Sequence, residues 1–407
     1  MSDQRLLVTT SLHQTLDKSK KILFLGEWCK PFSSGDELRR LNSITIPYHW
    51  DDRKKLLNDF IYLETVYEKL LIFCSQKLNS IHGTQFSVDY WRIVIGPWLG
   101  QFSQIIFDRW FCINAAETEF SIDQTIIVDF QEYFFVPDNH EHFSLMGWSQ
   151  EWNHYLMSSI IEFQGKIRFK KIKYSLGLDK NSIKQNFIEQ KPSFLRRIFS
   201  FITRVSKIFS NNGYVFFLNT YLPTWKELFL QIYMLQMPRL FSTLSFKHSQ
   251  FNPLMRNWTI EDSDLDDFEK CLYSMITSNI PLSYLEDFKD LAELPQRNGW
   301  PKKPSLIWTS NSYSSDDIFK IWAAEQNNSG IPIVIGQHGG GIGTHLFAFY
   351  EQHQIQISES YLSWGWEDSS FSNIKPIGIL KTPKRRKANH YGEEKIMMVT
   401  CALQQQS

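Results

Sequence analysis

The last third of the chain carries a histidine inside a glycine-rich run, directly after an apolar segment at 331–335. Glycines after a buried strand let backbone N–H groups approach an anionic group such as a phosphate or a sugar acid. An imidazole there can act as a general base or donate to a phosphate oxygen, so we predict His338 as the central catalytic residue. The alternative is a tight strand exit with a structural histidine. The predicted substrate-binding neighbours are Gln337, Gly339, Gly340 and Gly341.

Three better-known glycine motifs do not fit this run. The dinucleotide-binding pattern GxGxxG fails because position 344 is a threonine, and the chain has no GK[ST] string of a phosphate-binding P-loop. The string HGGG resembles the oxyanion loop of lipases and esterases. That mechanism also needs a GxSxG turn for its nucleophile, which the sequence lacks, so a hydrolase is disfavoured.

Acidic residues elsewhere are further candidates for a catalytic base. Glu27 and the aromatic Trp28 follow an apolar segment at 21–25. Ligand-facing residues of α/β sheets lie at the carboxyl ends of strands, so we predict Glu27 as catalytic and Trp28 as substrate-binding. Glu359, and with it Glu351, can supply a base if its segment folds over the cleft. A surface position for each carboxylate is the alternative.

Arg92 lies in an apolar, aromatic-rich segment, 90–99, that the pair Gly96-Pro97 interrupts. Its guanidinium can hold a carboxylate or phosphate through two hydrogen bonds, and we predict it as substrate-binding. Pairing with a carboxylate of the protein core remains open. Because proline breaks helices, we expect this segment to be separate from the helical stretch at 101–117.

The sequence predicts neither a metal ion nor another cofactor. Asp264-Leu265-Asp266 resembles the metal-binding DxD motif of one class of glycosyltransferases, but it precedes apolar residues at helical spacing and is expected to cap a helix. The loop at 138–142 has an aspartate and two histidines, but nothing completes a coordination set. Five scattered cysteines form no CxxC pair and indicate a reducing compartment.

The elements that would position these residues alternate between strands and helices. A segment at 51–78 has apolar residues at helical spacing, with acidic residues at its start. Segments 306–309 and 331–335 flank a helix that ends near 326, which predicts a right-handed β–α–β unit with parallel strands. The fold class is therefore α/β with a parallel sheet and many helices. Further strands are expected at 6–10, 21–25, 126–130, 214–217 and 395–400.

Composition excludes some classes of partner. The 407 residues include 43 basic and 43 acidic ones, and this neutral balance argues against nucleic-acid binding. The start of the chain has no signal-peptide pattern, and no apolar run is long enough for a membrane span. We expect a cytoplasmic protein. The apolar and basic segment 194–209 can place it at the inner face of the cytoplasmic membrane, or can simply pack on its own domain.

Eight sequence motifs, each several residues long and in the same order as in a known family, carry a resemblance to that family. The chain resembles a family of transferases from bacterial O-antigen and surface-polysaccharide gene clusters, and the resemblance runs from the first strand to about residue 400. The strings that carry it are LFLGEWC, PYHWDDR, YEKLL, YWRIVIGPWL, DRW, WTSNSYSSDDIFKIWAAE, GQHGGGIGTH and ISESYLSWGW.

The resemblance implies a GT-B-like fold with a Rossmann-like N-terminal domain. It implies an acceptor-side domain at 1–381, with helical insertions at about 144–300, and places His338, Gly339 and Gly340 at the reaction centre. Members of the family continue past the strand KIMMVT into a domain that binds the donor. The stretch 382–407 is accordingly expected to be a linker and the first strand of a donor domain that is largely missing.

The function implied is that of a glycosyltransferase of lipopolysaccharide, O-antigen or capsule biosynthesis. It would move a sugar from a nucleotide-sugar donor to a glycan or lipid-linked acceptor, without a metal. The alternative is a non-catalytic, truncated remnant that binds a glycan or a partner enzyme. The two differ in whether the chain binds a nucleotide sugar.

Overall fold

The computed structural model describes residues 4–30, 40–130, 133–174, 213–258, 264–339 and 341–381, and it contains two five-stranded parallel sheets. The N-terminal sheet has the order β3 (Ser43–Thr45), β2 (Ile22–Phe24), β1 (Arg5–Val8), β4 (Ile122–Asp129) and β5 (Phe169–Lys173). The C-terminal sheet has the order β10 (Ile374–Pro376), β9 (Ser360–Ser363), β8 (Ile333–Gly336), β7 (Leu306–Thr309) and β6 (Val215–Leu218).

Every neighbouring pair of strands in both sheets is parallel, which confirms the α/β class predicted from the sequence. Central strands of parallel sheets are covered on both faces and are therefore apolar throughout. Leu6, Leu7 and Val8 of β1 are buried in this way, as are Ile22, Leu23 and Phe24 of β2. The strand expected at 395–400 and the linker before it lie outside the described residues.

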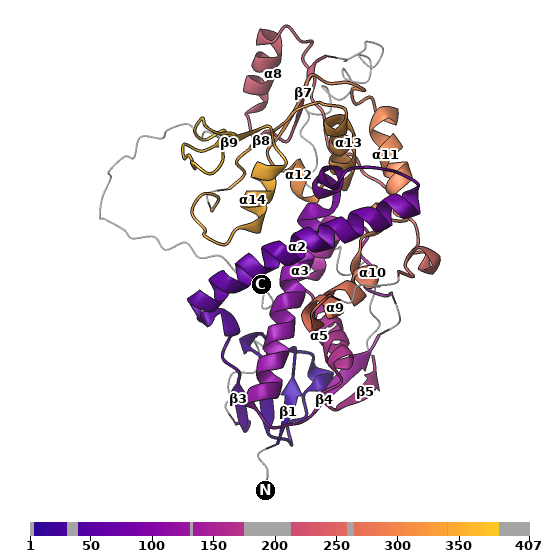
Figure 1. The fold of residues 1–407 in the computed structure, drawn as a ribbon, viewed down its shortest axis with the longest axis vertical. Coiled ribbons are helices and arrows are strands. Elements are labelled where there is room, and N and C mark those ends of the chain that lie inside the picture. The colour runs from indigo at the N-terminus through magenta and orange to yellow at the C-terminus, as the bar shows by residue number, and fades with distance from the viewer. Residues whose placement is uncertain are drawn as a thin grey trace, which may run out of the picture.

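Two long helices lie between the sheets, α2 (Arg53–His82) and α3 (Val88–Glu119), as Figure 1 shows. The start predicted for α2 is confirmed, because the carboxylate of Asp52 accepts hydrogen bonds from the backbone N–H groups of Lys54 and Lys55. The helix ends at Gly83, whose φ of 67° is the left-handed conformation that glycine adopts without strain.

Helix α3 continues through Gly96 and Pro97, so the expected interruption is wrong. Burial along this stretch outweighs the missing backbone hydrogen bond of the proline. The two glycines of the helix have a packing role. A Cβ added at Gly96 would lie 2.7 Å from Cε1 of His353, and one at Gly100 would lie 2.0 Å from the ring of Phe349. Both contacts come from α14 (Phe349–Gln356), which the glycines allow to pack closely on α3.

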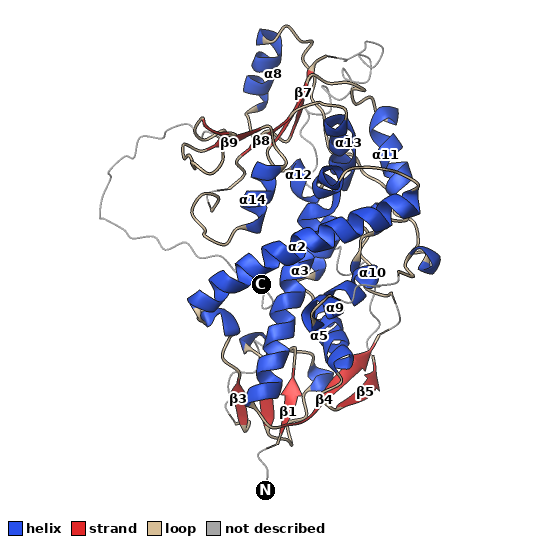
Figure 2. Cartoon of the chain, in the orientation of Figure 1, coloured by secondary structure: helices blue, strands red, loops and turns tan. Residues whose placement is uncertain are grey.

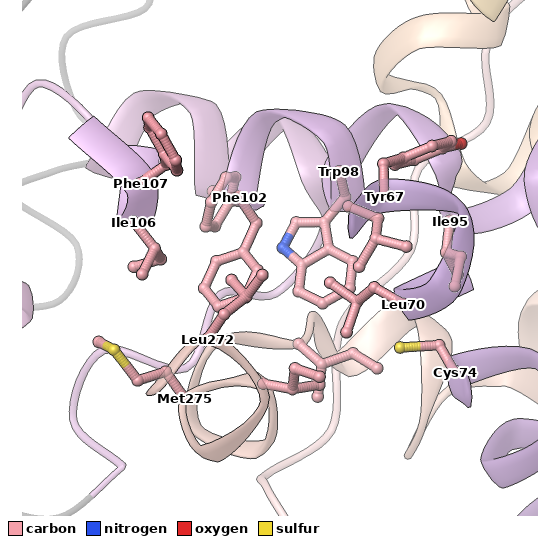
Figure 3. Close-up of a cluster of buried hydrophobic side chains, with 14 of the residues drawn as sticks. Tyr67, Leu70, Cys74, Ile95, Trp98, Phe102, Ile106, Phe107, Leu272 and Met275 are labelled. Atoms are coloured by element: carbon pink, nitrogen blue, oxygen red, sulfur yellow. The ribbon is translucent and has the colours of Figure 1, made fainter. Parts of the chain in front are cut away.

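A cluster of buried hydrophobic side chains lies where α2, α3 and α9 (Asp267–Ser274) meet (Figure 3), and it belongs to a core that extends to strands of both sheets. Trp98 and Phe102 of α3 stack with ring centroids 5.4 Å apart, and neither is exposed. Leu70 and Cys74 from α2 pack beside them, and Leu272 approaches from α9. The aromatic content of the chain thus serves a large interior.

The remaining helices cover the sheets and connect them (Figure 2). They are α4 (His140–Met146), α5 (Gln150–Gln164), α8 (Thr224–Tyr233), α10 (Ile276–Asn279), α11 (Phe288–Arg297), α12 (Ser312–Ser315) and α13 (Asp317–Asn328). Short 3-10 helices occur at His13–Thr15, Glu27–Cys29, His49–Asp51, Pro253–Met255 and Leu282–Tyr284.

Within its described residues, the region 144–300, expected as helical insertions, holds α5, α8, α9, α10 and α11, and also the edge strands β5 and β6 of the two sheets. The β–α–β unit predicted in the last third is confirmed as β7, α13 and β8. The predicted cap at 264–266 is confirmed as well, because Asp266 and Glu269 form a capping box at the start of α9.

Within the described ranges, no helix combines the length and the apolar character that a membrane span needs. The segment 194–209, for which membrane contact and packing on its own domain are the two alternatives, lies outside those ranges.

A fully buried ion pair joins α13 to its surroundings. The ammonium of Lys320 lies 2.8 Å from a carboxylate oxygen of Asp317, and both residues belong to the first turn of α13. The hydroxyl of Tyr284 donates to the Asp317 carboxylate and accepts a hydrogen bond from Lys320. The backbone N–H of His140 donates to the other carboxylate oxygen of Asp317. Burial alone would raise the pKa of Asp317, but Lys320 and these hydrogen bonds outweigh it and lower that pKa.

Replacing Lys320 by methionine leaves the Asp317 carboxylate without its cation in the interior. We expect Lys320→Met to lower the free energy of unfolding by about 3–5 kcal/mol, the usual cost of removing one partner of a buried ion pair. Denaturant unfolding measures this loss. Arg297→Ala is the control, since it removes an exposed ion pair with Glu293 and should cost less than about 1 kcal/mol. An equal loss of unfolding free energy in the two variants would contradict the claim that the buried ion pair stabilises the fold more than the exposed one.

Candidate functional site

Polar and aromatic side chains gather where the strands of the C-terminal sheet end. The chain leaves β6 toward Tyr221, leaves β7 toward Asn311, and leaves β8 toward His338. Carboxyl ends of parallel strands meet at one edge of the sheet, and ligands of α/β proteins bind there. Backbone and side-chain bonds tie the first two loops together, because Ser310 donates from its N–H to Asn219 and from its hydroxyl to Thr220.

His338 packs on Tyr221 while remaining exposed to solvent. The ring centroids are 5.4 Å apart and the rings are inclined by only 29°, so they stack. Partial loss of hydration lowers the pKa of His338 from its ordinary value, and the positive charge of Lys381 lowers it further. The imidazole is therefore neutral at pH 7, which is the form that a general base needs.

The loop after β6 holds Tyr221 in an unusual backbone conformation. Tyr221 has a φ of 61° and Asn219 a φ of 51°, in the left-handed region that side chains other than glycine rarely occupy. Two side-chain bonds hold the loop: the amide of Asn311 donates to the Tyr221 hydroxyl at 3.1 Å, and that of Asn219 donates to Ser312 at 2.9 Å. Strain of this kind concentrates at functional sites, where surrounding contacts maintain it.

Lys381 places a cation at the same stacked pair. Its ammonium lies 5.2 Å from the centroid of the Tyr221 ring, a cation–π contact. Within the described part of the chain no carboxylate forms an ion pair with it. A neutral base and an uncompensated cation therefore share one aromatic ring, an arrangement suited to removing a proton near a negatively charged group.

Gln337 positions the glycine-rich loop. Its amide nitrogen donates to the carbonyls of Gly339 and Ile342, and its amide oxygen accepts from the backbone of Trp364 and the indole of Trp366. The buried side chain thus uses its hydrogen-bonding capacity within the protein. A direct substrate contact by Gln337 stays a prediction.

The glycines of the loop differ in their surroundings. A Cβ at Gly339 would meet no atom within 4 Å, whereas one at Gly341 would lie 2.8 Å from the ring of His345. The backbone N–H of Gly343 donates to the carboxylate of Glu351 at 2.6 Å, and this bond ties the end of the glycine-rich loop to α14. Gly340 lies outside the described residues.

The other predicted site residues lie elsewhere. Glu359 is exposed just before β9, and its N–H donates to the carbonyl of Ile333 at the start of β8. It therefore lies at the amino end of the strands, away from the edge where His338 lies. Arg92 lies on α3 and binds the carboxylate of Glu68, a partly exposed residue, through two hydrogen bonds of 2.6 and 2.8 Å. A substrate contact by Arg92 stays a prediction.

Glu27 and Trp28 follow β2, at the carboxyl end of the N-terminal sheet as expected. Glu27 is exposed and pairs with Lys30 at 2.5 Å. The indole of Trp28 donates to the carbonyl of Thr9, and the guanidinium of Arg109 lies 5.6 Å from its ring. These two residues share a sheet edge with each other, but not with His338.

Three possible metal ligands lie close together near Trp28. The ligand atoms of His49, Asp108 and Cys112 lie within 4.8 Å of one another. Burial raises the pKa of the Cys112 thiol, which keeps it protonated, and the carboxylate of Asp108 already accepts hydrogen bonds from Tyr48, His49 and Arg109. These contacts indicate a buried structural network.

Sequence reasoning missed the partners of His338. Tyr221 and Asn311 follow segments that were predicted as strands, so the strand-end rule that selected His338 also applies to them. Lys381 follows an irregular segment after β10, and no local pattern marks it.

Removal of the Lys381 charge should change the titration of His338. We expect an NMR titration to give a His338 pKa below the usual value of about 6.5 and a higher value in Lys381→Met. Lys375→Met, which removes an exposed lysine on β10, is the control and should leave the titration unchanged. An identical His338 pKa in all three proteins would contradict the electrostatic coupling.

A comparison with known families bears on the chain as a whole. No curated protein and no solved structure matches it. A family model described as LIC12162 family transferase matches residues 5–407, which include both sheets and the strand-end site around His338. Because this match covers nearly the whole chain, the protein belongs to the LIC12162 family of transferases.

Proposed function

We propose that the protein is a glycosyltransferase that moves a sugar from a nucleotide-sugar donor to a surface-polysaccharide acceptor. The observation that carries the proposal is the neutral imidazole of His338 beside the cation of Lys381, at the carboxyl ends of parallel strands. Membership of a transferase family supports group transfer. The choice of a sugar rests on the resemblance to enzymes of O-antigen, lipopolysaccharide and capsule synthesis.

In the proposed reaction, His338 removes the proton from an acceptor hydroxyl. The acceptor oxygen then forms a bond to the anomeric carbon of the donor sugar, while the bond from that carbon to the leaving phosphate oxygen breaks. Negative charge accumulates on the departing nucleotide phosphate. Lys381 and backbone N–H groups of the glycine-rich loop are the groups that would stabilise it.

The wider proposal is a GT-B-like enzyme at the cytoplasmic face of the membrane. The two parallel sheets are compatible with Rossmann-like domains. The donor-binding domain expected from 382 onward, the membrane contact at 194–209, and the catalytic roles of Glu27 and Glu359 stay predictions. If the chain acts as a non-catalytic glycan-binding module instead, it should bind no nucleotide sugar.

The role of His338 can be tested by measuring sugar transfer. The assay incubates the purified protein with a panel of radiolabelled nucleotide sugars and membranes from a strain that lacks the gene. We expect His338→Ala to reduce transfer by about 100-fold or more, the range for loss of a general base. His13→Ala, on the exposed surface of the N-terminal region, is the control and should retain full activity.

Two results would contradict the proposal. Undiminished transfer by His338→Ala would remove the histidine from the reaction. Absence of both transfer and nucleotide-sugar binding by the unaltered protein would favour the binding module.

A further inference from the structure

A cavity of about 400 Å³ adjoins the ends of β6 and β7. Its size lies within the range of roughly 300–1,000 Å³ that is usual for small-molecule pockets. The residues that matter for its chemistry are Asn219, Phe246, Asn311, Ser312, Ser315 and Asp316. The reaction proposed above uses none of these side chains directly.

Two of the residues that line the cavity each have a buried side-chain oxygen without a hydrogen-bond partner among the described residues. One carboxylate oxygen of Asp316 caps α13 by accepting from the N–H of Phe319 at 2.9 Å, and the other, Oδ2, is buried without a partner. The amide nitrogen of Asn311 donates to Tyr221, but its oxygen, Oδ1, is likewise buried and unpaired. An unpaired buried acceptor costs free energy, so both atoms are suited to receive donors from a bound molecule.

The charges around the cavity exclude an anionic ligand. No lysine or arginine is among the described residues that line it, whereas Glu141, Asp316 and Asp317 are. Asp317 is neutralised by Lys320, and His248 in the same wall pairs with Asp287. A nucleotide diphosphate would therefore find no lysine or arginine among the described lining residues and would meet the carboxyl groups of Glu141 and Asp316, which opposes its binding.

The chemistry of the wall matches hydroxyl groups. Burial raises the pKa of Asp316 to about 7, so near neutral pH its free oxygen can either accept or donate a hydrogen bond. A sugar hydroxyl has the same dual capacity. Phe246 adds an aromatic surface to the wall, of the kind against which the apolar face of a pyranose can pack.

We propose that this cavity binds a neutral hexopyranose through the free oxygens of Asp316 and Asn311. Asn311 connects the cavity to the site above, because the same side chain donates to Tyr221, on whose ring His338 stacks. Describing this sugar as part of the acceptor glycan rests on the proposed function. Its binding does not, and can be measured without turnover.

Saturation-transfer NMR with neutral methyl hexopyranosides and N-acetylhexosaminides tests the cavity directly. We expect saturable binding by the full chain and about tenfold weaker binding by Asp316→Asn, as for the loss of a buried hydrogen bond. Asparagine also caps helices well, so α13 should remain intact, and a circular-dichroism melt verifies this. Asp52→Asn makes the same change at the cap of α2 and should bind like the unaltered protein.

Other results would overturn the inference. They are no binding of any sugar in the panel, equal binding by Asp316→Asn, or displacement of the sugar signal by UMP or CMP. His338→Ala separates this inference from the proposed function: sugar binding should persist in that variant even where transfer is lost. Loss of transfer with no sugar binding in any protein would refute the cavity and leave the proposed reaction standing.

Discussion

The buried charge of Lys320 is the constraint around which the C-terminal half is arranged. An ammonium removed from water must have partners on every side, and here they are Asp317 from its own helix and Tyr284 from a distant 3-10 helix. The backbone N–H of His140, the first residue of α4, donates to the other carboxylate oxygen of Asp317. Together these contacts fix the first turn of α13. Because α13 is the crossover between β7 and β8, the same contacts set the positions of the two strand ends from which Asn311 and His338 emerge.

The site depends on electrostatics that no single residue supplies. Partial loss of hydration lowers the pKa of His338, and the positive charge of the exposed Lys381 adds to that effect. Their common contact with Tyr221 brings positive charge close to an imidazole and favours its neutral form. The adjoining cavity has the opposite character, with carboxylates and amides in its wall. Under the proposed function this contrast separates a region for the phosphates of a donor from a region for the hydroxyls of an acceptor.

Local patterns predicted the parts of this structure that depend on neighbours in sequence. The helix after Asp52, the β–α–β unit around α13 and the place of His338 after β8 all follow from periodicity, caps and strand ends. Contacts between distant segments could not be predicted in this way. Helix α3 continues through Pro97 because distant segments bury this stretch, and Arg92 binds Glu68 from a neighbouring helix. Lys381 reaches Tyr221 across 160 positions of sequence, so no local spacing signals it.

The pH dependence of sugar transfer tests the central claim, that a neutral His338 acts as base beside Lys381, most directly. Rates measured under single-turnover conditions should fall as the pH drops through the pKa of His338, with a midpoint below about 6.5. In Lys381→Met that midpoint should move upward, because the cation that disfavours protonation is gone. An acid limb that is absent, or that stays in place when Lys381 is replaced, would contradict the account.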